Sequence, residues 1–217
     1  TMGSGIDKHE LEYSICDVLL GEASARQALV KSPEGGYDVL PANADLTAAE
    51  VQLVNNIGRE RQLTLALEPL RDDYDYILID CPPSLNMLTV NALVAANGVV
   101  IPMQCEYYAL EGLSSLLDTI EQIRISVNPE IRIEGLLRTM YDSRNNLSND
   151  VSSELVEHFG DRVYRTVIPR NVSLAEAPSF GQSILKSDKN ARGSMAYLAR
   201  AGEVLRRDAK QGHYVNQ

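Results

Sequence analysis

The feature that most constrains this 217-residue chain is an alternation of short apolar runs with longer stretches of helical spacing. The apolar runs are rich in Val, Ile and Leu, as in strands that are buried on both faces, and turn residues mark their ends. This alternation predicts an α/β fold with a mostly parallel sheet. The expected strands are 37–41, 76–80, 98–105, 131–140 and 162–169. The expected helices are 46–70, 86–97 (ended by Gly98), 110–126, 149–159 (with Ser148 as N-cap) and 194–207.

The composition is that of an ordinary globular chain, with 44% hydrophobic and 23% charged residues. We expect one domain over residues 1–207 and a polar tail over 208–217. No apolar run approaches the ~20 residues that a membrane-spanning helix needs, and no secretory signal pattern opens the chain. The cysteines Cys16, Cys81 and Cys105 are scattered, which argues against a zinc site or disulfide framework and indicates a reducing cytoplasm.

Charge is distributed unevenly along the chain. The formal net charge of −10 argues against wholesale nucleic-acid binding. Residues 160–217 nevertheless contain ten Lys and Arg against five Asp and Glu, a net of +5, whereas residues 1–159 contain ten against twenty-five, a net of −15. A basic C-terminal quarter fits either a local anionic partner such as DNA or an ordinary solvated helix face.

The stretch YDYILIDCPPS, residues 74–84, carries a carboxylate to the end of an apolar run. The residue at the carboxyl end of a parallel strand faces the ligand crevice of such a fold. An acid there is a recurring way to hold Mg²⁺ near nucleotide phosphates, which makes Asp80 a candidate metal-site residue. The alternative is that Asp80 caps a helix or pairs with an arginine. Pro82 and Pro83 cannot continue a strand ladder, so a stiff loop is expected to follow.

Three long blocks of sequence widen this context: DYILIDCPPSL at 75–85, VVIPMQCEYYALEGL at 99–113 and TVIPRNVSLAEAPSFG at 166–181. Together they closely resemble the ParA/Soj family of chromosome-partitioning ATPases, deviant P-loop proteins related to the division-site protein MinD. The resemblance covers the chain from Gly3 to about Arg207. It implies a doubly wound, P-loop NTPase-like sheet with helices on both faces, and ATP with Mg²⁺ as cofactors.

The resemblance also implies roles for particular residues. Asp80 matches an aspartate that supports Mg²⁺ through water, and Pro82, Pro83 and Ser84 match a switch-like loop that responds to the γ-phosphate. The segment Ile168, Pro169, Arg170 and Asn171 matches the loop that borders the adenine. Met140 is a further candidate for the base pocket, with an ordinary core methionine as the alternative.

One part of the family's machinery is not found in this sequence. A P-loop requires G-x-x-x-x-G-K-[ST], and none of the fourteen glycines is followed by lysine. The resemblance implies that the first strands, the P-loop and a water-orienting acid lie ahead of the segment that matches Thr1–Gly5. We therefore expect a domain truncated at its N-terminus that is not competent to hydrolyse ATP by itself, with no catalytic residue assigned within it.

The family implies an ATP-bound homodimer in the cytoplasm that associates with the nucleoid, binds DNA without sequence preference and responds to a ParB-type centromere-binding protein. Arg144 matches a DNA-contacting arginine of the family. Ser173 stands where the family commonly has a basic residue, and Arg165, Arg170, Lys189 and Arg192 could compensate. The alternative for each is a surface residue without such a task. The polar C-terminus, from Lys210, lacks the basic amphipathic helix that a membrane-recruited relative would need.

Two other functions fit parts of the sequence. The first is a non-catalytic interaction or regulatory module that pairs with ParA or ParB proteins, which the missing Gly-Lys pair favours. The second is a response-regulator receiver, which also places an aspartate at a strand end. The prolines after Asp80 and the additional strands argue against a receiver.

Overall fold

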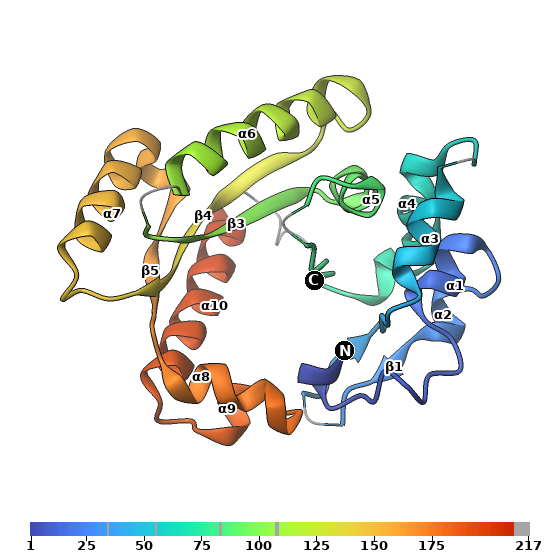
Figure 1. Ribbon diagram of the computed structural model, residues 1–217, viewed down its shortest axis with the longest axis horizontal. Coiled ribbons are helices and arrows are strands. Elements are labelled where there is room, and N and C mark those ends of the chain that lie inside the picture. Colours follow the sequence, from blue (N-terminus) through green and yellow to red (C-terminus); the bar gives the residue numbers. More distant parts are fainter. Residues whose placement is uncertain (34, 55, 83, 107–108, 211–217) are drawn as a thin grey trace. The chain divides into compact units, whose positions relative to one another are not determined.

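The computed structural model describes residues 1–33, 35–54, 56–82, 84–106 and 109–210. The chain forms two compact units, each built from several segments of the sequence. The first unit comprises residues Thr1–Gly98, Thr119–Arg132 and Pro178–Ser183, and the second comprises Val99–Asp118, Ile133–Ala177 and the chain from Ile184. Figure 1 shows the elements of both units.

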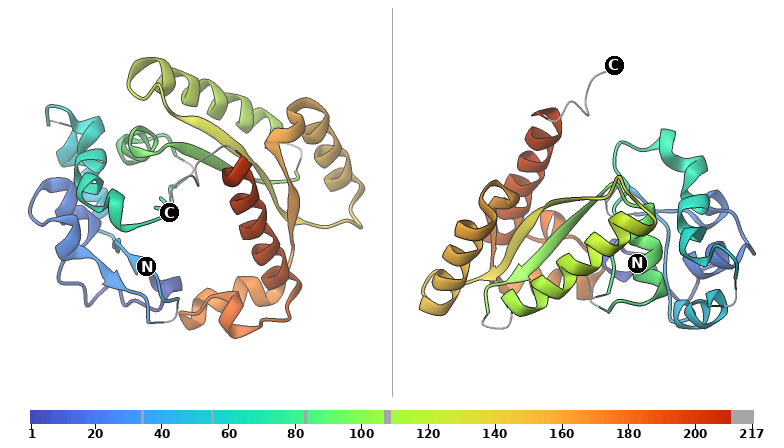
Figure 2. Two further views of the ribbon diagram at one scale, coloured as in Figure 1. Left: turned by 180° about the vertical axis from the view of Figure 1, so that it is seen from behind. Right: turned by 90° about the horizontal axis from the view of Figure 1, so that it is seen from above.

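The second unit is an α/β layer. Its strands are β3 (Gly98–Gln104), β4 (Arg132–Tyr141) and β5 (Val163–Pro169), in the order β3-β4-β5. Strands β4 and β5 pair in parallel. Helix α6 (Ala109–Ser126) follows β3, and α7 (Asn146–Phe159) connects β4 to β5. The short helices α8 (Val172–Glu176) and α9 (Ile184–Ser187) lead into α10 (Arg192–Lys210). Figures 1 and 2 show α10 on one face of the sheet and residues 109–118 of α6 on the other.

Helix α10 packs on β5 through an unusually polar face. The carboxylate of Glu203 accepts the backbone N–H groups of Arg165 and Thr166, at 2.8 and 2.9 Å. The guanidinium carbons of Arg200 and Arg207 lie 3.5 and 4.0 Å from the centre of the Tyr164 ring, which is buried. These contacts occupy backbone donors of a strand at the end of the sheet order, donors that would otherwise need water or another strand.

Strand β4 is irregular at two places. Its register against β5 shifts between Leu136 and Arg138 and again between Arg138 and Tyr141. Gly135 has φ 155°, and a Cβ there would lie 2.6 Å from the carbonyl oxygen of Arg162. Met140 has φ 51°, a left-handed conformation that a side chain disfavours. The second irregularity therefore changes the direction of the backbone at the carboxyl end of β4.

The first unit is mainly helical. Its buried core includes Leu53, Leu63, Leu67, Leu70 and Ala92. Its elements are α1 (Ile15–Leu20), α2 (Ala25–Ala28), β1 (Val30–Lys31), β2 (Asp38–Val39), α3 (Leu46–Leu53), α4 (Gln62–Leu67) and α5 (Met87–Ala95). Strands β1 and β2 pair antiparallel. Across both units, the structure also has short 3-10 helices at Met2–Ser4, Arg59–Arg61, Glu68–Asp73, Gly160–Arg162 and Ala177–Phe180.

The predicted α/β class is confirmed, and the expected strands at 98–105, 131–140 and 162–169 are β3, β4 and β5 to within a residue at each end. The predicted strand at 76–80 is wrong: this segment is extended coil without a ladder among the described residues, and Leu78 is 91% exposed. An apolar run becomes a strand only where a neighbouring strand accepts its backbone hydrogen bonds.

Four smaller expectations are also corrected. The helix at 46–70 is divided, because Gly58 adopts a left-handed φ of 68° between α3 and α4. Helix α5 ends at Ala95, and Gly98 begins β3 instead of capping the helix. Asn145, not Ser148, is the N-cap of α7, since its side chain accepts the N–H of Leu147. Helix α10 is longer than the expected 194–207.

Candidate functional site

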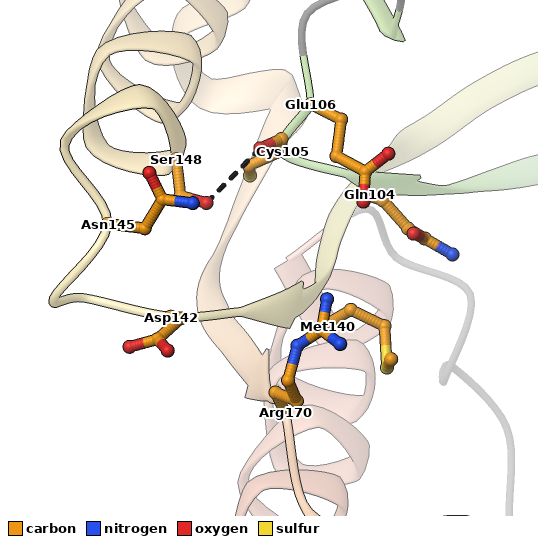
Figure 3. Close-up of a pocket in the computed structure, with 8 residues that line it drawn as sticks. All are labelled: Gln104, Cys105, Glu106, Met140, Asp142, Asn145, Ser148 and Arg170. Carbon is orange, nitrogen blue, oxygen red and sulfur yellow. Dashed lines mark hydrogen bonds between the residues drawn. The ribbon is translucent and has the colours of Figure 1, made fainter.

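A pocket of about 230 Å³ lies at the carboxyl ends of the three strands of the second unit (Figure 3). Its position follows from the pairing of the strands. The hydroxyl of Thr139 donates to the carbonyl of Met103 at 3.2 Å, and the N–H of Arg170 donates to the carbonyl of Tyr141 at 3.1 Å. The ends of β3, β4 and β5 therefore meet there. The lining residues are Gln104, Cys105, Glu106, Met140, Asp142, Asn145, Ser148 and Arg170.

Hydrogen bonds from α7 hold one wall of the pocket in place. The hydroxyl of Ser148 donates to the carbonyl of Cys105 at 3.2 Å, the dashed contact in Figure 3. The next residue of α7, Asn149, accepts from the hydroxyl of Tyr141 at 2.5 Å. Burial raises the pKa of the Cys105 thiol, although the charge of Arg138 opposes this, so the thiol stays protonated at neutral pH. Ser148 and Cys105 thus make this wall polar but uncharged.

The lining of the pocket carries opposite charges. Asp142 follows β4 and Arg170 follows β5, so the two charged groups come from the ends of paired strands. The guanidinium of Arg144 is hydrogen-bonded to Asp142 and holds the pKa of that carboxyl well below its usual range, with a smaller contribution from Arg170. Asp142 is therefore ionised at neutral pH.

The structure brings together two of the predicted nucleotide-binding residues of the second unit. Met140 and Arg170 both line the pocket. Ile168 is buried in the core beneath it, against Leu137 and Tyr164, so only its backbone is available to a ligand. Pro169 ends β5, and the side chain of Asn171 caps α8 by accepting the N–H of Leu174 at 2.9 Å.

The remaining candidates for the nucleotide and metal belong to the first unit. Asp80 and Pro82 are exposed in coil, and Pro83 lies outside the described residues. The carbonyl of Ser84 accepts a hydrogen bond from the hydroxyl of Thr89 at 2.7 Å, which ties this loop to the first turn of α5. Among the described residues there is no group of three or more His, Cys, Asp or Glu that could enclose a metal ion. The exposed Asp80 carboxylate fits only a metal that takes most of its ligands from water or from a bound nucleotide.

The predicted DNA-binding residues are exposed in the second unit: Arg144, Arg165, Lys189 and Arg192. Their contacts differ. The side chain of Arg144 is 88% exposed yet paired with Asp142, whereas the backbone of Arg165 is fixed by Glu203. Lys189 lies in the turn between α9 and α10, and Arg192 opens α10. Ser173 lies in α8.

Sequence reasoning missed most of the polar lining of the pocket, namely Gln104, Glu106, Asp142, Asn145 and Ser148. Glu106 and Gln104 lie inside a block already used for the family resemblance, and Asp142 lies within two residues of Met140 and Arg144. The available signal was position. Gln104 and Glu106 lie at the carboxyl end of the expected strand 98–105, and Asp142, Asn145 and Ser148 lie between the expected strand 131–140 and the helix that follows it.

Comparisons with known proteins settle the family. A family model described as an AAA domain matches residues 1–133. The chain is 50% identical to the chromosome partitioning protein ParA of Caulobacter vibrioides, over 95% of this chain and 78% of that protein. It is 48% identical to the sporulation initiation inhibitor protein Soj of Bacillus subtilis, over 94% and 81%. This chain belongs to the ParA/MinD family of ATPases. An uncharacterised protein of Pseudomonas putida is 63% identical, over 97% of this chain and 80% of that protein.

Solved structures agree with this assignment. The cobyrinic acid a,c-diamide synthase of Mycobacterium smegmatis with bound ATP analogue and magnesium has a TM-score of 0.82 and 37% identity, covering 97% of this chain and 78% of that chain. The cell division ATPase MinD of Pyrococcus furiosus has a TM-score of 0.76 at 22% identity, covering 94% and 79%, and so supports the fold alone. The predicted P-loop NTPase-like α/β fold is confirmed, and binding of ATP and Mg²⁺ is a property of the ParA/MinD family. Within the described residues, no helix combines the length and apolarity needed to cross a membrane.

Proposed function

We propose that this chain is the body of a ParA/Soj-type partition ATPase of a chromosome or plasmid. In the intact protein, ATP and Mg²⁺ support a homodimer that binds DNA without sequence preference, and a ParB-type centromere-binding partner regulates it. The observation that carries the proposal is the pocket at the carboxyl ends of β3, β4 and β5, which places Met140 beside the Arg170 loop in a chain of this family. Such proteins work in the cytoplasm on the nucleoid, and no membrane partner is proposed.

In this proposal the pocket receives the adenine side of ATP. The thioether of Met140 supplies a polarisable contact for the base, and the backbone of Ile168, Pro169 and Asn171 supplies hydrogen bonds to its edge. Arg170 lines the pocket, where an anionic ligand would meet its charge. The polar lining and the strand-end position support this assignment.

Asp80 is proposed to hold Mg²⁺ through water, and Pro82, Pro83 and Ser84 to form the loop that senses the γ-phosphate. When bound, the metal neutralises charge on the phosphates. The exposed carboxylate of Asp80 is accessible to a hydrated ion. The Ser84–Thr89 hydrogen bond gives this loop a direct connection to α5, by which a change in the loop would be felt by a helix.

DNA binding is proposed for Arg144, Arg165, Lys189 and Arg192. Contacts to phosphate depend on charge and reach, and all four side chains are exposed in one unit. They lie within or just ahead of the region of net positive charge described above. The absence of a basic side chain at Ser173 predicts weaker binding than in a relative that has one there.

The 217 residues contain no Gly-Lys pair, so we propose that this chain by itself is not competent to hydrolyse ATP. The same observation favours a second candidate function, a non-catalytic module that pairs with ParA or ParB proteins. The two candidates differ in whether the chain binds nucleotide once phosphate-binding groups are supplied.

Calorimetric titration of MgATP distinguishes them. Two proteins are compared, this chain and a form extended ahead of Thr1 by a segment containing G-x-x-x-x-G-K-[ST]. The partition ATPase predicts binding and hydrolysis by the extended form and neither by the chain alone. Equal binding to both forms would show that another element holds the phosphates. Failure of both forms to bind, with the extended form folded by circular dichroism, would favour the non-catalytic module.

A further inference from the structure

The side chains of Asp142 and Arg144 form a tight local pair at the edge of the pocket. Oδ1 of Asp142 accepts both the backbone N–H of Arg144, at 3.0 Å, and its Nε–H, at 2.9 Å. Oδ2 of Asp142 accepts from Nη2 of Arg144 at 2.8 Å. One complete edge of the guanidinium is therefore occupied by a carboxylate.

Exposed ion pairs usually contribute little, because two long side chains must be ordered to form them. This pair differs in two respects. Its partners are two residues apart and share a backbone hydrogen bond, so Asp142 is already held in place by the turn that leads into α7. The contact is also bidentate, the strongest geometry between a guanidinium and a carboxylate. The side chain of Asp142 is only 29% exposed, compared with 88% for Arg144.

Asp142 thus lies between two cations with different surroundings. It lines the pocket together with Arg170, whose charge acts on it, and it also pairs with the outward-facing Arg144. A phosphate that approaches Arg144 meets a guanidinium with one edge occupied and a carboxylate directly beside it. The carboxylate lowers the positive potential at this point and repels the phosphate.

We propose that Asp142 is a positioning residue that restrains Arg144 and lowers its affinity for the phosphates of a nucleic-acid backbone. The inference rests on the proposed function, in which Arg144 contacts DNA. It adds that the strength of this contact is set by its acidic neighbour at the rim of the nucleotide pocket. Release of Arg144 from Asp142 makes both edges of the guanidinium available and removes one negative charge from the DNA-facing surface.

The test compares Asp142→Asn, Arg144→Gln and the double variant in the extended, P-loop-bearing form with MgATP present. Asparagine keeps an oxygen that can accept the backbone N–H of Arg144, so the turn is retained. Asp188→Asn is the matched control. It removes the same charge beside Lys189, and Asp188 has a hydrogen bond to the N–H of Asn190 but no ion pair within the described part of the chain. Binding to a labelled DNA duplex of arbitrary sequence is measured by anisotropy over a range of salt concentrations.

We expect Asp142→Asn to tighten DNA binding by about 3- to 10-fold at low salt. The slope of the logarithm of the binding constant against the logarithm of the salt concentration should become steeper by up to about one. Asp188→Asn should change binding by less than half as much on a logarithmic scale. The double variant should bind like Arg144→Gln alone. The proposal is overturned if Asp142→Asn binds no tighter than the control, or if the double variant keeps the gain.

The design separates this proposal from the function on which it rests. If Arg144→Gln weakens binding but Asp142→Asn does not strengthen it, only the role of Asp142 fails. If Arg144→Gln binds DNA like the parent chain, Arg144 is not a DNA contact and that part of the proposed function fails. A second readout needs no DNA: the NMR signal of the Arg144 Nε–H should shift more on titration with inorganic phosphate in Asp142→Asn than in the parent chain. Equal shifts would contradict the restraint.

Discussion

Met140 combines a strained backbone with a position in the pocket. A side chain at φ 51° crowds its own backbone, and Met140 is the one non-glycine residue with positive φ in the described part of the chain. Met140 lies at a register shift. Between the pairs Arg138–Val167 and Tyr141–Pro169, β4 has one more residue than β5, so the chain must bulge there. The strain is therefore concentrated where the strand delivers a side chain to the candidate base site.

Two substitutions at Met140 separate backbone from side chain. Met140→Ala removes the thioether and keeps the strained conformation, whereas Met140→Gly removes both. We expect the glycine variant to be more stable than the alanine variant by about 1 kcal/mol in chemical denaturation. Both should weaken nucleotide binding in a P-loop-bearing form to a similar degree. Equal stability of the two variants would show that the backbone at this position is not strained.

The lowered pKa of Glu203 predicts that the free energy of unfolding decreases in acid. Burial disfavours its charge, but the N–H groups of Thr166 and Arg165 and the guanidinium of Arg207 outweigh burial and lower its pKa from 4.5 to about 2. Since the folded-state pKa is the lower one, the stabilisation is complete above about pH 4.5 and is lost as pH falls toward 2. Its size is on the order of 3 kcal/mol.

Glu203→Gln removes this linkage. We expect the variant to be less stable at pH 7 and its stability to change less than that of the parent chain between pH 4.5 and the acid limit of folding. Denaturant titrations at a series of pH values measure both quantities. A variant with the same pH dependence as the parent chain would mean that another carboxylate dominates the acid transition.

At the scale of elements, two glycines of the second unit have opposite roles. Gly135 in β4 has φ 155°, and an added Cβ would approach the Arg162 carbonyl oxygen and the Tyr164 ring to 2.6 Å. Gly112 lies within α6, and an added Cβ would meet no atom within 4 Å. The same substitution therefore tests a close strand-to-strand approach in one element and helix propensity in the other.

We expect Gly135→Ala to destabilise the protein by about 2–4 kcal/mol, because the neighbour that must move is backbone. Gly112→Ala should stabilise it by about 0.5–1 kcal/mol. Thermal denaturation of the two variants alongside the parent chain measures both. A destabilised Gly112→Ala or a neutral Gly135→Ala would indicate that α6 or β4 is packed differently.

The elements of the second unit were predictable because local and tertiary signals agree there. Runs such as VVIPM and VIP are apolar, short and bounded by turn residues, and each belongs to a strand that pairs with a neighbour in the sheet. The segment 76–80 carries an equally strong local signal but no neighbour among the described residues, and sequence alone does not reveal pairing. Likewise Asn145 and Ser148 are both good N-cap residues, and only the hydrogen bond to Leu147 distinguishes them.

The candidate site was predictable only in part. Met140 and Arg170 were reached through the family resemblance, and the structure places both at one pocket. Gln104 ends β3, Asn145 is the N-cap of α7 and Ser148 lies in the first turn of that helix. Polar residues are common at the ends of strands and helices, so nothing in their types marked them. Asp142 was not predicted because its importance lies in a contact with a neighbour, Arg144, and the family resemblance pointed to Arg144 alone.

At the scale of the whole molecule, the candidate residues are divided between two compact units. Asp80, Pro82 and Ser84 belong to the first unit, and the pocket and the basic candidates belong to the second. Each set is proposed to contribute to the binding of MgATP. The extended, P-loop-bearing form should therefore gain thermal stability with MgATP, by about 2.7 kcal/mol at a hundredfold excess over the dissociation constant. Asp80→Asn should reduce that gain with MgATP and leave stability without nucleotide nearly unchanged.

The most direct test of nucleotide binding at the pocket is photolabelling of the extended form with an azido-adenine analogue of ATP, followed by peptide mapping. Placement of the base at the ends of β3, β4 and β5 predicts labelling in the peptides that contain Met140 or Arg170, and loss of that labelling when unmodified ATP is added in excess. Labelling that excess ATP removes, but that lies in peptides outside the pocket, would contradict the assignment of this pocket to the adenine.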